Sequence, residues 1–106
     1  MPEMHFHIRW PDGESERCYS PSLVIKEHFE PGQSYELADF LGRSRLALTI
    51  ASDRVRARYG HPCSLALGQL ARIEARAARY RAAPVDEVPV ARVHVERFEE
   101  QTGGIV

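Results

Sequence analysis

The longest regular pattern in the chain is helical; it begins near Ser34 or Tyr35 and runs to Tyr59. Its apolar residues recur at steps of three and four, which places them on one face of a helix: Leu37, Phe40, Leu41, Ala47, Leu48, Ile50, Ala51 and Val55. Gly60 is placed to end this helix in the left-handed conformation. Gly42 lies inside it, costs about 1 kcal/mol relative to alanine, and indicates a close packing contact or a break.

A second amphipathic helix is predicted from about Cys63 to Tyr80, after a corner formed by His61 and Pro62. Its apolar stripe is Leu65, Leu67, Leu70, Ile73, Ala77 and Tyr80. A short connection between two long helices predicts an antiparallel pair. Ile50 and Leu67 fall beside the main stripes, so the pair is expected to leave an apolar seam suited to a homodimer or a larger enzyme.

Three shorter segments alternate apolar and polar residues, as strands with one buried face do. Residues 4–10 and 15–20 flank the turn signal Pro-Asp-Gly at 11–13, which predicts a hairpin. Residues 91–98 form the third segment, after a proline-punctuated linker at 82–90. The predicted fold is therefore α+β, a three-stranded antiparallel sheet packed on one face by the two antiparallel helices.

The length of 106 residues predicts one domain, residues 1–106, with a frayed tail from about residue 100. The segment 23–29 is left open between helix and strand, because Val24 and Ile25 are β-branched. No apolar run approaches the length of a membrane span, and no secretory signal precedes the first strand, so we expect a cytoplasmic protein without a membrane partner. The net charge of −1 argues against nucleic acid as a partner.

Two places could carry chemistry, and the first is a set of histidines. If Met4, Phe6 and Ile8 face the helices, then His5, His7 and His94 all lie on the outer face of the sheet. Neighbouring strands would bring these imidazoles close enough to share a metal, with Glu96 or Glu16 available to orient them. The alternative is a solvated or interface surface, and the strand order decides between the two.

The second place is the junction of the stretch CYSPS with the end of the long helix. It gathers hydroxyls, a carboxylate and guanidinium groups that suit a carboxylate or phosphate ligand: Tyr19, Ser20, Ser22, Thr49, Ser52, Asp53, Arg54, Arg56 and Tyr59. The alternative is that the serines cap a helix while Asp53 pairs with a neighbouring arginine. Since no GxSxG elbow, phosphate-cradling glycine loop or paired CxxC motif is present, we assign no catalytic residue and expect no cofactor.

Several stretches together resemble a family of small bacterial proteins known as a nitrogen starvation response family. The resemblance is colinear over roughly residues 3–98 and is carried by RWPDG, CYSPSLVIKEHF, PGQSY, DFLGRSRLALTIASDRVRARYG, CSLALGQLARIEARA and VHVERF. It implies a gene cluster that also encodes a nitrilase, a radical SAM protein, an acetyltransferase and a flavoprotein. It implies no catalytic residues.

The expected function is that of an accessory or small-molecule-binding protein in a nitrogen-starvation-induced, nitrilase-linked metabolic or biosynthetic pathway, with no catalysis of its own. Its expected partners are a second copy of the chain, another protein of the same gene cluster, and a small-molecule ligand. The alternative is a small metal-dependent enzyme or metalloprotein that uses the histidine face of the sheet.

Overall fold

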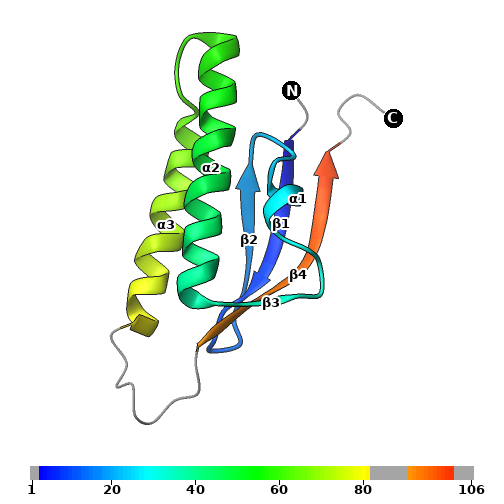
Figure 1. The fold of residues 1–106 in the computed structure, drawn as a ribbon, viewed down its shortest axis with the longest axis vertical. Helices are drawn as coiled ribbons and strands as arrows, with labels where there is room; N and C mark the ends of the chain where they lie inside the picture. Colours follow the sequence, from blue (N-terminus) through cyan, green and yellow to red (C-terminus); the bar gives the residue numbers. More distant parts are fainter. Residues whose placement is uncertain (1–2, 82–90, 102–106) are drawn as a thin grey trace.

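The computed structural model describes residues 3–81 and 91–101, so the predicted linker and residues 102–106 of the tail lie outside the described residues. Its elements in chain order are β1 (Glu3–Arg9), β2 (Ser15–Ser20), α1 (Ile25–His28), β3 (Ser34–Glu36), α2 (Leu37–Tyr59), α3 (Ser64–Arg81) and β4 (Arg92–Gln101). The strands form one sheet in the order β2-β1-β4-β3, with every neighbouring pair antiparallel (Figure 1).

The predicted hairpin is confirmed. Phe6 of β1 pairs with Cys18 of β2, and both side chains are fully buried. In the turn, the Asp12 carboxylate accepts a hydrogen bond from the Glu14 N–H at 3.0 Å, and Gly13 has φ +92°. The carboxylate bonds a backbone group two residues on, and glycine takes the positive φ, as the turn signal predicts.

The sheet has four strands, so the expectation of three was wrong. The predicted start of the helix near Ser34 or Tyr35 was also wrong, because residues 34–36 pair with β4, with Tyr35 opposite Val93. The helix begins only at Leu37, whose N–H donates to the Ala91 carbonyl at 3.0 Å. This bond to the residue before β4 holds the start of the helix against the sheet, and three residues are too few for strand alternation to be detected in the sequence.

The two long helices lie side by side on one side of the sheet (Figure 1). Gly60 ends α2 with φ +86° and donates its N–H to the Arg56 carbonyl at 2.8 Å, as expected of a left-handed cap. Gly42 does not mark a break or a close contact, because α2 runs through it and a Cβ added there would meet nothing within 4 Å. The open segment 23–29 contains the short helix α1, and its Ile25 is buried in the core.

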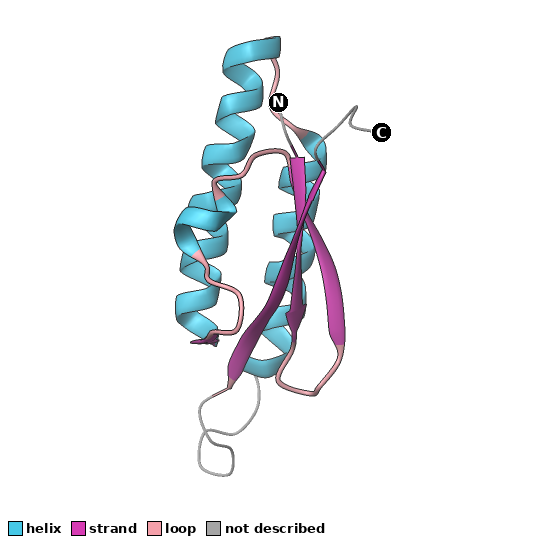
Figure 2. Ribbon diagram, turned by 90° about the vertical axis from the view of Figure 1, so that its right-hand side faces the viewer, coloured by secondary structure: helices cyan, strands magenta, loops and turns pink. Residues whose placement is uncertain are grey.

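The molecule has two layers, with strands in one and helices in the other (Figure 2). The core lies between them and includes the inward-facing side chains of the sheet, Met4, Phe6, Ile8, Cys18, Val93 and Val95. The alternate residues of β1 and β4 lie on the outer face, where they are partly exposed. Within the described residues, no helix is long and apolar enough to cross a membrane.

Candidate functional site

The junction predicted from CYSPS and the long helix is partly assembled. Arg54 of α2 donates from Nη1 to the Ser22 hydroxyl at 2.9 Å, and Ser20 donates its own hydroxyl to the Ser22 carbonyl at 2.7 Å. The Ser22 hydroxyl also accepts the Val24 N–H at 3.3 Å, so it supports the chain just before α1. Both serines are buried, while Arg54 extends to the surface and its Nη2 lies 4.0 Å from the Glu27 carboxylate.

The other residues predicted for this site do not join the cluster. The Tyr19 hydroxyl donates to Glu3 at 2.8 Å on the outer face of the sheet, and burial, with this bond, raises its pKa. Ser52 is buried and accepts the Cys63 N–H at 3.2 Å, which holds the turn between α2 and α3. The remaining predicted residues are exposed on α2: Thr49, Asp53, Arg56 and Tyr59.

The three predicted histidines share the outer face, since β1 and β4 are neighbours. Their surroundings differ, however, because the register places Glu99 opposite His5, Arg97 opposite His7, and Arg9 opposite His94. Among the residues that the structure describes, no group of three or more His, Cys, Asp or Glu side chains is placed to hold a metal ion.

Each histidine has its own environment. His7 Nε2 hydrogen-bonds to Glu99 at 2.8 Å, and His94 Nδ1 to the Ser34 hydroxyl at 2.9 Å. The His5 ring lies edge-on to Tyr19, with 5.6 Å between ring centroids, and its Nδ1 is buried without a described partner. Burial, followed by the positive charge of Arg17, lowers the pKa of His5.

Glu99 is the centre of the charge network on this face. It accepts from His7 and, at 2.7 Å, from Arg17, while Arg97 lies 3.8 Å away. The bonds from His7 and Arg17 lower the pKa of Glu99 to about 2. The histidine nearest to this carboxylate is therefore engaged in a network that fixes strand pairing, as cross-strand pairs of opposite charge do.

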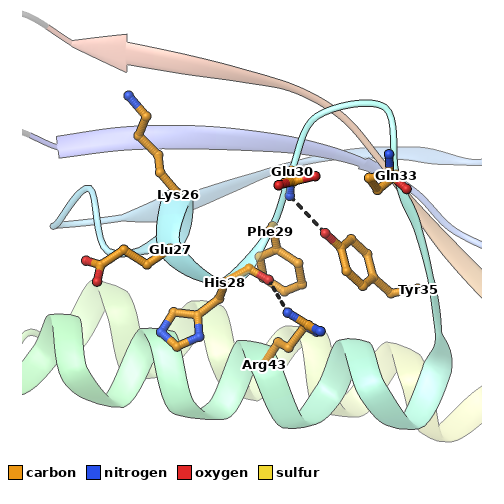
Figure 3. A pocket seen from close by; sticks show the side chains of 8 residues that line it. All are labelled: Lys26, Glu27, His28, Phe29, Glu30, Gln33, Tyr35 and Arg43. Atoms are coloured by element: carbon orange, nitrogen blue, oxygen red, sulfur yellow. Dashed lines mark hydrogen bonds between the residues drawn. The ribbon is translucent and has the colours of Figure 1, made fainter.

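A hollow of about 350 Å³ that the sequence did not reveal lies between α1, the loop before β3, and α2 (Figure 3). It is lined by side chains from segments that are separated in the sequence: Lys26, Glu27, His28, Phe29, Glu30, Gln33, Tyr35 and Arg43. In the sequence, the Glu-Pro-Gly stretch at 30–32 is a signal that ends the preceding element. Its role in turning the chain back over the start of α2 depends on tertiary contacts that the sequence pattern does not record.

Arg43 is held at this hollow by two hydrogen-bonded partners and an aromatic ring. Its Nε donates to the Asp39 carboxylate at 3.0 Å and its Nη1 to the His28 carbonyl at 2.7 Å. The guanidinium carbon also lies 5.0 Å from the centroid of the Tyr35 ring, within the range of a cation–π contact. The Tyr35 hydroxyl accepts the Glu30 N–H at 2.8 Å, so hydrogen bonds fix both the Tyr35 ring and the Arg43 guanidinium (Figure 3).

The hollow carries charges of both signs above an apolar base. Phe29 is 1% exposed and lies edge-on to Tyr35 at 5.2 Å between centroids. Glu27 and Glu30 bring carboxylates, and Glu27 also connects the hollow to Arg54 of the predicted cluster. Such a lining suits a small polar molecule with two kinds of group. Its hydrogen-bond donors would pair with the carboxylates of the hollow, and its acceptors would pair with the Arg43 guanidinium.

Comparison with known proteins agrees with the resemblance noted from the sequence. The sequence model of the family described as "Nitrogen starvation-induced protein NitG" matches residues 5–97, which include all three helices, β2, β3 and most of β1 and β4. No curated protein and no solved structure matches the chain significantly. The chain belongs to this family of nitrogen starvation-induced proteins.

Proposed function

We propose that this protein is an accessory, small-molecule-binding component of a nitrogen-starvation-induced, nitrilase-linked metabolic or biosynthetic pathway, and that it performs no catalysis of its own. Membership of the nitrogen starvation-induced family supports the physiological setting. The nitrilase linkage rests on the gene cluster that the resemblance implies. The hollow between α1 and α2 is the binding site in this proposal.

The observation that carries the proposal is the preorganisation of Arg43. Two hydrogen-bonded partners and an aromatic ring hold its guanidinium at the hollow in the free protein. Because the side chain is already ordered, a ligand that pairs with it does not have to meet the entropic cost of fixing a long flexible side chain, which is about 0.5–1.5 kcal/mol for each such side chain.

The chemistry of the lining supports binding rather than group transfer. The hollow includes His28 and two carboxylates, which can donate and accept hydrogen bonds. Its one hydroxyl, that of Tyr35, accepts a backbone N–H and lies beside the Arg43 guanidinium. No serine, threonine or cysteine is among the lining residues, so the hollow lacks the hydroxyl and thiol nucleophiles that acyl-transfer enzymes commonly use.

Protein partners are part of the proposal: a second copy of the chain and another protein of the same gene cluster. Four large apolar side chains support a protein contact on the helix pair, because they are among the exposed residues of α2 and α3: Leu46, Tyr59, Leu65 and Leu67. Leu46 is 54% exposed and Leu67 is 44% exposed, as expected of helix faces that a partner would cover.

Native mass spectrometry of the untagged protein, purified without chelator from nitrogen-starved cells, tests this function. We expect a dimer mass that includes a retained small molecule. That molecule should be lost from the Arg43→Ala variant and kept by Arg58→Ala, which removes an exposed arginine far along α2. Turnover of substrate by the purified protein alone would contradict the proposal. A stoichiometric metal that disappears when His5, His7 and His94 are replaced would support the histidine face instead.

A further inference from the structure

A second hollow of about 410 Å³ lies between β2 and α3 and is not used by the proposed function. It is lined by Glu16, Arg72, Ala75, Arg76 and Arg79. The three arginines are spaced four and three residues apart, so they project from one face of α3. With one carboxylate among them, the lining side chains carry two more positive charges than negative ones.

The middle arginine is already committed to the fold. Arg76 Nη2 donates to Asp12 at 3.1 Å and to Glu14 at 2.8 Å, both on the hairpin turn. Its Nε donates to the Tyr80 hydroxyl at 3.1 Å, and its guanidinium carbon lies 5.7 Å from the centroid of the Trp10 ring. Arg76 therefore fastens α3 to the hairpin, and its charge is balanced by that turn.

The outer two arginines differ from Arg76. Both are exposed, and among residues 3–81 and 91–101 no carboxylate lies within 4.0 Å of Arg72 or Arg79. The described contact of Arg72 is with a neutral group, since its Nη2 donates to the Gln69 side-chain oxygen at 3.2 Å. Two guanidinium groups thus stand at the hollow with their charges uncompensated by the described part of the protein.

Glu16 sets the position of a ligand within the hollow. Its carboxylate accepts the Trp10 indole N–H at 2.8 Å and lies 3.9 Å from the Cys18 sulfur. It is therefore fixed beside the core and repels an anion placed next to it. Anionic groups are favoured near Arg72 and Arg79 instead, which are separated by seven residues, or about 10 Å along the helix axis.

We propose that this hollow binds a small dicarboxylate, with one carboxylate on Arg72 and the other on Arg79. Guanidinium groups bind carboxylates through two parallel N–H···O bonds, so two arginines two helical turns apart suit a molecule with an anionic group at each end. A molecule with one carboxylate engages only one of them. This site is independent of the hollow at Arg43, so each proposal can fail without the other.

A calorimetric titration of the full-length protein with glutarate tests the proposal. We expect glutarate to bind at least tenfold more tightly than acetate. Arg72→Ala and Arg79→Ala should each weaken glutarate binding at least tenfold, whereas the matched control Arg58→Ala should leave it unchanged. Arg72→Lys keeps the charge but loses the planar fork, so it should weaken binding to an intermediate extent.

Any of the following results would overturn the proposal: no binding of glutarate by the folded protein, equal affinity for acetate and glutarate, or unchanged glutarate affinity in the double variant Arg72→Ala/Arg79→Ala. Inorganic phosphate separates the two classes of oxyanion, because phosphate that binds as tightly as glutarate contradicts the dicarboxylate assignment. Circular dichroism of each variant shows whether a loss of binding comes from unfolding. Arg43→Ala should bind glutarate like the wild-type protein, since it alters only the other hollow.

Discussion

Replacing Phe29 by alanine should destabilise the fold and remove the base of the hollow at Arg43. The Phe29 side chain is 1% exposed and packs against three rings, with centroid distances of 6.1 Å to Phe6, 5.3 Å to Phe40 and 5.2 Å to Tyr35. Truncating a buried phenylalanine to alanine costs about 3–5 kcal/mol, because apolar burial is lost and a cavity is left. A domain of this size has a total stability of about 5–15 kcal/mol, so the loss is a large fraction of it.

Urea unfolding followed by the fluorescence of Trp10, the single tryptophan, measures this effect. Trp10 is 2% exposed, so its emission should change on unfolding. With an m-value of about 2 kcal/mol/M, a loss of about 4 kcal/mol lowers the unfolding midpoint by about 2 M. Arg58→Ala is the control, because Arg58 is exposed on α2 and its truncation should change the free energy of unfolding by about 0.5 kcal/mol or less. A loss below about 1 kcal/mol for Phe29→Ala would refute the packing described for the core.

Three further predictions concern charge, backbone and thiol chemistry. The folded-state pKa of Glu99, about 2, lies below its ordinary value of 4.5, so its stabilising effect is complete above that value and is lost as pH falls towards 2. Unfolding free energies at pH 6 and pH 2.5 should differ less for Glu99→Gln than for the wild type, and an equal difference would contradict the network. In thermal unfolding, Gly42→Ala should stabilise the protein by about 0.5–1 kcal/mol, because Gly42 lies inside α2. Gly60→Ala should destabilise it by about 1 kcal/mol, because Gly60 has a positive φ. Changes of the opposite sign would be evidence against these backbone assignments. Burial raises the pKa of the Cys18 thiol, so a thiol reagent should modify Cys63 first in the folded protein, and rapid modification of both would contradict the burial of Cys18.

Elements with a long periodic pattern could be predicted from the sequence. The two long helices span many turns, so their apolar residues repeat often enough to define a buried face, and Gly60 ends the first of them as expected. The hairpin could be predicted because the Pro-Asp-Gly turn separates two alternating segments. In both cases the local pattern and the tertiary packing require the same conformation.

The strand β3 could not be predicted, because it is defined by a partner rather than by its own pattern. Its three residues lie immediately before the helical stripe that begins at Leu37, so the sequence pattern does not separate them from the helix. Only the pairing with β4, 58 residues further along the chain at Tyr35 and Val93, gives the segment its extended conformation. Such tertiary pairing overrides a weak local preference.

The sequence predicted the junction of Ser20, Ser22 and Arg54 but not the hollow at Arg43. Ser20 and Ser22 adjoin Arg54 because the chain turns from β2 into α1 beside α2, and the hydroxyl and guanidinium chemistry of these residues suggested that junction. Arg43 lies on the polar side of the long helix, where nothing in the sequence pattern distinguishes it from the other arginines of that helix. Its position over Tyr35 depends on β3, so the hollow could not be predicted without the fourth strand.

The most direct test of the binding proposal is a two-dimensional NMR titration of the 15N-labelled protein with the small-molecule fraction of nitrogen-starved cells. We expect the amide signals that shift most to belong to residues 26–30, 32 and 33 and to Tyr35 and Arg43, and we expect these shifts to disappear in Arg43→Ala. Shifts confined to other parts of the chain, or a spectrum that the fraction leaves unchanged, would contradict the claim that the hollow between α1 and α2 is a binding site.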